Sequence, residues 1–137
     1  MPASRKVGDC MTRSPVTVER HTTLAHALKL MDDRGIRHLP VVEGAHLVGL
    51  ISERELRIVD NMQGFNATFC TVGDFVEGMP YAVPETTSVR EVVTTMATKK
   101  YGSAVVVGGE GGDTVLGVFT TTDALRIFAE VLDEIER

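Results

Sequence analysis

The sequence predicts an α+β fold in which one unit, with the element order β-α-β-β-α, occurs twice. Apolar residues recur at helical spacing at the same place in each half of the chain, and turn and cap residues separate the stretches in the same order. Short runs also repeat with a constant offset of 65 positions: residues 7–9 (Val-Gly-Asp) as 72–74, Pro15 as Pro80, and Met31 as Met96. Such a repeat predicts two copies that pack on each other, with two related clefts where they meet.

Length and composition fit one globular protein. The chain has 137 residues, of which 43% are apolar and 24% are charged, an ordinary balance for a folded domain. A unit of half this size buries only about 60% of the surface of its unfolded chain. We therefore expect the two halves to share one core.

Charge and patterning exclude several classes of function. A net charge of −5 gives no attraction to phosphate backbones or anionic lipids, so we expect neither nucleic acid nor a membrane as a partner. No apolar run approaches the roughly 20 residues of a membrane span, and residues 1–14 lack the apolar core of a secretory signal. Cys10 and Cys70 have no metal-type spacing, and we expect reduced cysteines in a cytoplasmic protein, with a disulfide between the repeats left open.

The first copy is assigned to residues 1–63, including an N-terminal lead-in. Thr22 or Thr23 offers a helix N-cap, and Gly35 a left-handed helix end. Ser52 offers the cap of a second helix. The expected elements are a strand over 16–18, a helix with Leu24, Leu28 and Met31 on one face, strands over 39–42 and 47–51, and a helix to about Met62.

A linker over 64–71 leads to the second copy, assigned to residues 72–137. Ser88 and Glu91, three residues apart, predict a full capping box. The expected elements are a strand over 81–83, a helix with Val89, Val92, Val93 and Met96 buried, strands over 103–107 and 115–119, and a helix from Asp123 to about Glu136. Its apolar face, made of Leu125, Phe128, Leu132 and Ile135, is expected to pack on the body or on another subunit.

The residues resemble the CBS domain family. Residues 117–123 (Gly-Val-Phe-Thr-Thr-Thr-Asp) match the G-h-x-T-x-x-D signature of that family, where h is apolar, and residues 49–55 are a softened copy. Residues 37–42 and the lead-in 7–12 are also similar to CBS sequences. The resemblance covers about residues 7–130, and it implies a CBS pair, or Bateman module, whose two repeats pack through their sheets about a pseudo-twofold axis.

The resemblance implies a function as well as a fold. CBS pairs commonly form homodimers and bind adenosine-containing ligands (AMP, ADP, ATP, S-adenosylmethionine or NAD) between their repeats. They usually act as regulatory sensors in signal transduction, without catalytic activity or a catalytic cofactor. Because no enzyme or channel domain is fused within this sequence, the effector would be a separate protein. The alternative function is a ligand-free dimerisation or scaffolding module.

Thr120 and Asp123 allow two interpretations. A fixed carboxylate can accept hydrogen bonds from both hydroxyls of a ribose, and phosphates nearby would meet free N–H groups and the positive end of the helix dipole. Thr-x-x-Asp is equally a helix N-cap followed by an acidic residue in the first turn, which stabilises a helix without any ligand. The spacing alone favours the helix cap, and the surrounding CBS pattern shifts the preference to binding.

The family's usual site is composite, with the carboxylate from one repeat and the adenine pocket from the other. Carried over, site A would join the Thr120/Asp123 motif to the start of the first repeat. Ile36 and Pro40 would hold the base, and Arg37 or His38 could meet a phosphate, although His38 is also explained as a polar residue at a strand start. The full set is Thr17, Ile36, Arg37, His38, Pro40, Thr120 and Asp123.

Site B departs from the family pattern and is expected to be weaker. Glu55 replaces the usual aspartate and is longer by one methylene, and Ala82 supplies no hydroxyl where site A has Thr17. Tyr101 could still stack on a base. The set is Ser52, Glu55, Ala82, Tyr101, Gly102 and Ser103.

Three other features carry no separate function. The four histidines lack the spacing of a metal site. The glycine-rich run 108–113 lacks a P-loop lysine and leads into a strand, so it predicts a hairpin turn. No nucleophile with a base and an orienting group can be named, so we expect no enzyme.

Overall fold

The computed structural model describes residues 5–62, 64, 66–76 and 78–137, and it divides into two compact units. The central unit is Pro15–Pro80, and the C-terminal unit combines residues 5–14 with Tyr81–Arg137. The lead-in therefore packs with the second repeat, although it precedes the first repeat in sequence. The repeat boundaries 1–63, 64–71 and 72–137 stay a prediction about the sequence.

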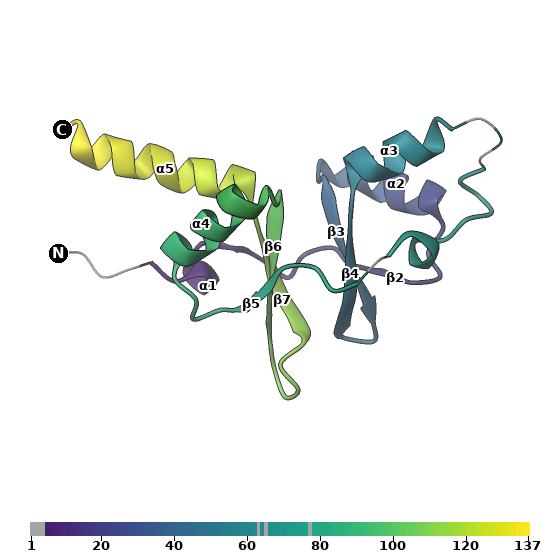
Figure 1. The fold of residues 1–137 in the computed structure, drawn as a ribbon, viewed down its shortest axis with the longest axis horizontal. Coiled ribbons are helices and arrows are strands. Elements are labelled where there is room, and N and C mark those ends of the chain that lie inside the picture. The colour runs from purple at the N-terminus through teal and green to yellow at the C-terminus, as the bar shows by residue number, and fades with distance from the viewer. Residues whose placement is uncertain (1–4, 63, 65, 77) are drawn as a thin grey trace. The chain divides into compact units, whose positions relative to one another are not determined.

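The central unit has the expected β-α-β-β-α order (Figure 1). Its paired strands form the order β2-β3-β4, with β2 parallel to β3 and β3 antiparallel to β4. The elements are β2 (Val18–Glu19), α2 (Leu24–Arg34), β3 (His38–Glu43), β4 (His46–Ser52), α3 (Glu53–Asp60) and a 3₁₀ helix η1 (Val72–Phe75). The expected strand over 16–18 is wrong in its bounds, because pairing with β3 begins only at Val18, and α3 ends two residues before Met62.

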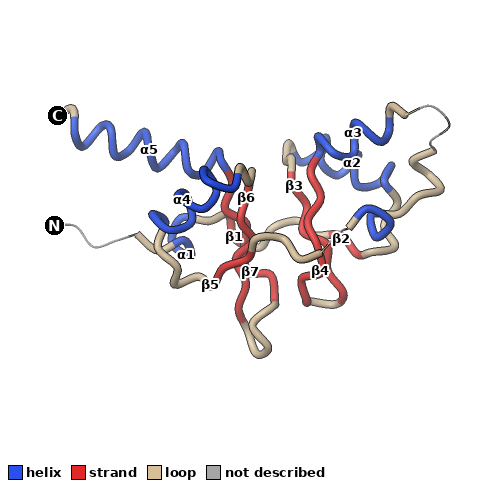
Figure 2. The backbone as a smooth tube through the Cα atoms, in the orientation of Figure 1, coloured by secondary structure: helices blue, strands red, loops and turns tan. Residues whose placement is uncertain are grey.

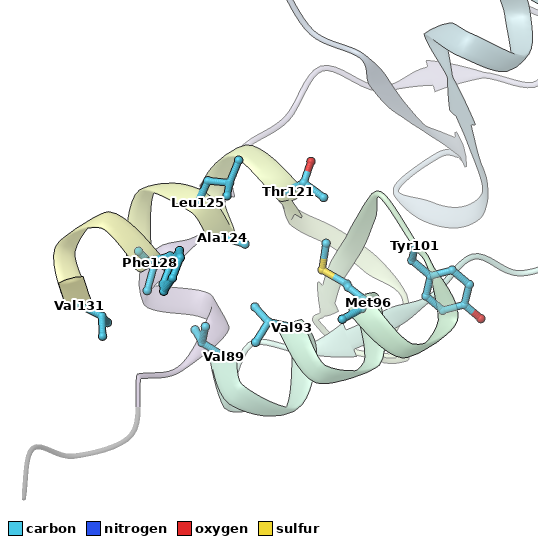
Figure 3. A pocket seen from close by; sticks show the side chains of 11 residues that line it. Val89, Val93, Met96, Tyr101, Thr121, Ala124, Leu125, Phe128 and Val131 are labelled. Carbon is cyan, nitrogen blue, oxygen red and sulfur yellow. The ribbon is translucent and has the colours of Figure 1, made fainter.

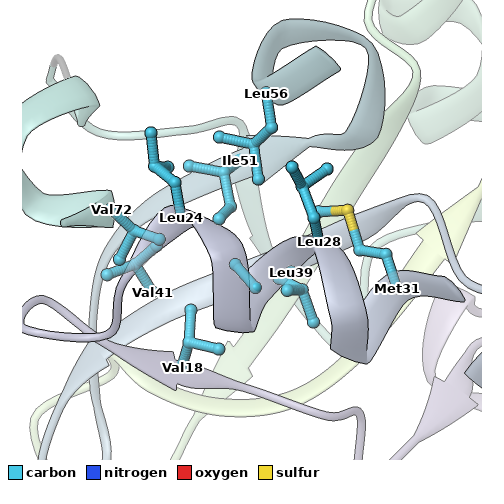
Figure 4. Packing of buried hydrophobic residues seen from close by; sticks show 10 residues of the cluster. Val18, Leu24, Leu28, Met31, Leu39, Val41, Ile51, Leu56 and Val72 are labelled. Atoms are coloured by element: carbon cyan, nitrogen blue, oxygen red, sulfur yellow. The ribbon is translucent and has the colours of Figure 1, made fainter. Parts of the chain in front are cut away.

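Local sequence signals fix the ends of these helices. The hydroxyl of Thr23 accepts the N–H of His26 over 3.1 Å, so Thr23 rather than Thr22 caps α2. Gly35 ends α2 with φ +63°, a conformation that favours glycine. Figure 4 shows Leu24, Leu28 and Met31 of α2 packed on Leu39, Val41 and Ile51 of the strands. The predicted apolar face of this helix is confirmed.

The C-terminal unit repeats the same order, with the lead-in added. Its strand order is β1-β7-β6-β5, with β5 parallel to β6 and the other pairs antiparallel. In each unit, Figure 2 shows the two longer helices on one side of the strands. The elements are α1 (Val7–Cys10), β1 (Thr12–Arg13), β5 (Ala82–Pro84), α4 (Val89–Lys99), β6 (Ser103–Gly108), β7 (Thr114–Thr120) and α5 (Thr121–Ile135).

Each of the two Val-Gly-Asp runs forms a backbone hydrogen bond with the other repeat. The N–H of Gly8 donates to the carbonyl of Glu85 over 3.0 Å, and the N–H of Gly73 donates to the carbonyl of Arg20 over 2.9 Å. A Cβ atom on Gly8 would lie 2.7 Å from the Cβ of Glu85, so the close approach of the backbones requires glycine there. The Val-Gly-Asp run that precedes each repeat's first strand or follows its last helix therefore packs with residues of the other repeat.

Two expectations for the C-terminal unit need correction. At Ser88 only half of the capping box is present: its hydroxyl accepts the N–H of Glu91 over 3.1 Å, while its backbone pairs with Lys6. On α5, Leu125, Phe128 and Ile135 are 66%, 55% and 71% exposed. The side chains of α5 that pack on the core are Ala124 and Ile127, so packing on the body is wrong for these three residues, and packing on another subunit stays a prediction.

No helix within the described residues combines the length and apolar character that crossing a bilayer requires.

Candidate functional site

A buried carboxylate lies at the start of α5. Asp123 is 3% exposed, and Thr120, the N-cap residue, precedes it by three positions. Asp123 Oδ2 accepts the N–H of Thr120 over 2.9 Å and its hydroxyl over 3.2 Å, while the N–H of Asp123 donates to Thr120 Oγ1 over 3.3 Å. These bonds form a reciprocal capping box. The helix-capping interpretation of this motif is confirmed, and its role in binding a ligand stays a prediction.

The second oxygen of Asp123 is held by side chains that the sequence did not indicate. Oδ1 accepts the hydroxyl of Thr12 over 3.5 Å and Nη1 of Arg126 over 3.1 Å. Arg126 follows Asp123 by three residues, a spacing at which helical ion pairs form, so the sequence carried a usable signal for it. Thr12 is 111 residues away, and no pattern in the sequence pairs it with Asp123.

The backbone donors at this helix end are mostly occupied. The N–H of Thr121 donates to the carbonyl of Gly102 over 3.2 Å, and those of Thr120 and Asp123 serve the capping box. The expectation of free N–H groups for a phosphate is therefore wrong for these three positions. The helix dipole remains, and it favours negative charge at the same place.

Ser103 is the one unpartnered buried side chain of the described residues. It is 4% exposed, and its Oγ has no hydrogen-bond partner there. Ser103 begins β6 directly opposite Thr120 of β7. Buried hydroxyls normally have a partner, so this one leaves capacity for a polar ligand close to the start of α5.

The other site B residues of this unit lie on neighbouring strands and turns. The rings of Tyr81 and Tyr101 are 5.5 Å apart between centroids and tilted by 31°. Tyr101 is 43% exposed. Ala82 lies on β5, opposite Val105 of β6. One face of the Tyr101 ring is therefore next to another aromatic ring, which leaves less of it for stacking on a base.

The central unit groups the remaining candidates. His38 begins β3 opposite Ser52, the N-cap of α3. The hydroxyl of Ser52 donates to Glu55 Oε1 over 2.8 Å and accepts the N–H of Glu55 over 3.2 Å. Burial lowers the pKa of His38. The negative charge of Glu55 opposes this with a smaller effect, and the positive charge of Arg37 adds a still smaller lowering.

The positions of the other site A residues differ in exposure. Thr17 and Arg37 are exposed, Ile36 is half-buried beside the core of its own unit, and Pro40 is buried. Each predicted site draws on both units, so the composite sites stay predictions. Within single units, the structure brings His38 next to Ser52, and Ser103 next to Thr120.

An apolar groove separates α4 from α5. Its volume is about 510 Å³. Val89, Val93 and Met96 project from α4 toward α5, which contributes Ala124 and Phe128 (Figure 3). The complete lining is Val89, Val93, Met96, Ala97, Tyr101, Thr121, Ala124, Leu125, Ile127, Phe128 and Val131. No charged side chain is among them.

The described part of the chain holds no cluster of three or more His, Cys, Asp or Glu residues able to bind a metal ion. Cys10 and Cys70 are free, and burial raises the pKa of the Cys10 thiol, with Arg5 opposing that effect.

Solved structures share this fold. A putative acetoin utilization protein (AcuB) from Vibrio cholerae is 29% identical, with a TM-score of 0.83 and coverage of 98% of this chain and 97% of that one. The CBS domain pair of protein MJ0100, in complex with 5′-methylthioadenosine and S-adenosyl-L-methionine, is 22% identical, with a TM-score of 0.82 and coverage of 93% of this chain and 98% of that one. CBSX2 in complex with AMP is 24% identical, with a TM-score of 0.79 and coverage of 93% of this chain and 98% of that one.

The chain spans less than half the length of the first curated relatives it matches, namely 25%, 44% and 15% of them. The family model described as CBS domain matches twice, over residues 7–60 and 72–130. These two stretches carry the capped helices and hairpins of both copies, and the chain therefore belongs to the CBS domain family, with two CBS domains in tandem.

Proposed function

We propose that this CBS pair is a regulatory module that binds an adenosine-containing ligand and signals to a separate effector protein. The observation that carries the proposal is the buried carboxylate of Asp123 beside Thr120, within the family's signature. Two solved CBS pairs, described above, hold AMP or 5′-methylthioadenosine and S-adenosyl-L-methionine, which supports a ligand of this chemical class.

Ribose would bind at the Oδ1 side of Asp123. Oδ2 is committed to the helix cap through two bonds from Thr120. Oδ1 is held by side chains alone, and one of these bonds, from Thr12, is 3.5 Å long. A ribose hydroxyl would exchange for one of these side-chain donors while the cap stays intact.

The adenine half of site A is proposed to come from Thr17, Ile36, Arg37, His38 and Pro40. The uncharged form of His38 is favoured by burial, and an uncharged imidazole can accept as well as donate a hydrogen bond. Site B is proposed to be the weaker of the two, because Glu55 is already bonded to Ser52. Ser103, with its unpartnered hydroxyl, is the residue of site B that most favours a ligand.

The test is a calorimetric titration of AMP, ADP, ATP, S-adenosylmethionine and NAD into the protein, after a screen for raised melting temperature. A ligand that binds only the folded state adds roughly 2.7 kcal/mol at about a hundred times its Kd. Saturable binding of one of the five supports the proposal, and its stoichiometry reports whether site B is used. The absence of heat and of any melting shift with all five would contradict it.

The groove between α4 and α5 favours a second candidate, a ligand-free homodimerisation module. Leu125 and Phe128 stand exposed beside the groove, so one surface offers both a hollow and projecting side chains, as a self-complementary interface requires. α4 ends with Lys99, followed by Lys100, whereas α5 carries Glu130, Asp133 and Glu134. A second copy laid across these helices would bring opposite charges together.

Light scattering at micromolar concentration tests this second candidate. A dimer that persists without ligand, and becomes monomeric in Phe128→Glu but not in Ile58→Glu, supports it. Ile58 is 60% exposed, close to the 55% of Phe128, but it lies in the central unit. A wild-type monomer would contradict the candidate.

CBS domains are generally regulatory, non-catalytic modules. The absence of catalytic activity and the cytoplasmic location stay predictions for this chain.

A further inference from the structure

The ion pair between Asp123 and Arg126 is asymmetric. The two side chains meet at 3.1 Å, yet the carboxylate is 4% exposed and the guanidinium 64% exposed. The four acceptor positions of the carboxylate are all used, two by Thr120, one by Thr12 and one by Arg126. A ribose therefore cannot bond to Asp123 without displacing one of these donors.

Arg126 is the donor that gives way at least cost. The Thr120 bonds form the cap of α5, and their loss would leave helix N–H groups without acceptors. Thr12 is anchored by its backbone, because β1 pairs with β7 at Val118. Arg126 is a long side chain that is 64% exposed, so it can turn into solvent without breaking a helix cap or a strand pairing.

The helical neighbour that could receive the displaced guanidinium already has an ion pair. Glu130, four residues further along α5, is the helical neighbour of Arg126. It is already paired with Arg5 at 2.7 Å, and Glu134 lies 3.8 Å from the same arginine. Arg126 would thus have to share Glu130 with Arg5, which leaves its guanidinium available to a negatively charged group of the ligand.

Resting on the function proposed above, we infer that Arg126 makes this site selective for adenosine phosphates over uncharged or cationic adenosyl compounds. A phosphate on the ribose pairs with the released guanidinium and with the positive end of the α5 dipole. S-adenosylmethionine brings a sulfonium instead, and its positive charge is repelled by both. Ser103, which the proposed function places in site B, begins β6 opposite Thr120, and its buried hydroxyl has no partner among the described residues.

The experiment compares adenosine, AMP and S-adenosylmethionine by calorimetry on wild type, Arg126→Gln, Arg126→Lys and Arg90→Gln. Arg90→Gln is the matched control, because it removes the same charge from an exposed position on α4. In wild type we expect AMP to bind most tightly and S-adenosylmethionine least. In Arg126→Gln the preference for AMP over adenosine falls by about tenfold, the loss of one charge-assisted hydrogen bond, and adenosine binds more tightly because its competitor is gone. Arg126→Lys and Arg90→Gln keep the preference.

The outcomes separate this inference from the proposed function. Equal binding of adenosine and AMP in wild type, or an unchanged ratio in Arg126→Gln, would overturn the inference and leave an adenosyl site. Loss of all three ligands in a folded Arg126→Gln would overturn it too, since Arg126 would then only position Asp123. No binding of any of the three to wild type would overturn the inference, and no binding of ADP, ATP and NAD either would contradict the proposed function as well.

Discussion

Lys100 adopts in the C-terminal unit the left-handed conformation that Gly35 adopts in the central unit. Their φ and ψ angles are +61° and 40° against +63° and 33°. Each follows the last residue of its helix and donates its N–H to a methionine carbonyl, of Met96 or Met31. The two repeats therefore share a helix ending, but only one of them has glycine at the position that favours it.

Replacement of Lys100 by Gly is expected to stabilise the protein. The left-handed conformation costs a residue with a Cβ roughly 1–2 kcal/mol, and the greater freedom of glycine in the unfolded chain offsets part of that gain. We expect a net increase of about 0.5–1 kcal/mol in the free energy of unfolding, measured by urea denaturation. Gly35→Lys is the reciprocal change and should lower it by about 1 kcal/mol. Equal stabilities of Lys100→Gly and wild type would show that the cap is not strained.

Alanine at Gly8 is expected to destabilise the protein more than alanine at Gly73. The added Cβ would lie 2.7 Å from the Cβ and 2.9 Å from the carbonyl oxygen of Glu85, whereas at Gly73 the nearest atom, the carbonyl oxygen of Arg20, is 3.0 Å away. Overpacking of this kind costs about 1–3 kcal/mol. Thermal unfolding of the two variants measures the order, and a Gly8→Ala variant as stable as wild type would contradict the described close approach.

The free energy of unfolding is expected to decrease as the pH drops, because His38 is protonated less readily in the folded state. Burial lowers the pKa of His38 in the folded state, so the unfolded state binds the proton more readily. The stabilising contribution is complete above the ordinary histidine pKa of about 6.5, and it is lost as the pH drops from there through the lowered folded pKa. In His38→Gln the melting temperature should change less between pH 7.5 and pH 5 than in wild type. His26→Gln, at an exposed position of α2, is the control, and identical pH profiles of His38→Gln and wild type would refute the assignment.

The order of elements was predictable because local signals fix it. Thr23, Gly35 and Ser52 mark helix ends through interactions within a few residues, and the apolar spacing of Leu24, Leu28 and Met31 determines which face of α2 is buried. These interactions depend on near neighbours in sequence, so a single sequence contains them.

What the sequence missed depends on contacts between distant segments. Gly8 closes on Glu85 and Gly73 on Arg20, and a repeat alone does not tell whether a lead-in packs on its own copy or on the other one. At the start of α4, the lead-in forms a bridge through the bonds from Val7 to Thr87 and from Val89 to Arg5, and no local pattern indicates it. On α5, helical spacing alone could not choose between the face of Leu125 and that of Ala124, since both are apolar.

At the candidate site, the sequence identified the carboxylate but not the donors around it. Thr120 and Asp123 were found by their spacing, which reflects a capping box. Thr12 reaches Asp123 only through the pairing of β1 with β7, and this pairing is long-range. The bonds that a ligand must displace are therefore visible only in the structure.

The most direct test of the account is a calorimetric titration of AMP into wild type, Asp123→Asn and Asp74→Asn. Asp74 forms the same reciprocal capping box with Thr71 at the start of η1, so both variants lose a carboxylate that caps a helix, at a cost of about 1 kcal/mol each. We predict that Asp123→Asn weakens AMP binding at least about tenfold, as expected for charge-assisted bonds to a ribose, while Asp74→Asn binds like wild type. Equal AMP affinity in Asp123→Asn and wild type would contradict a ligand site at Asp123.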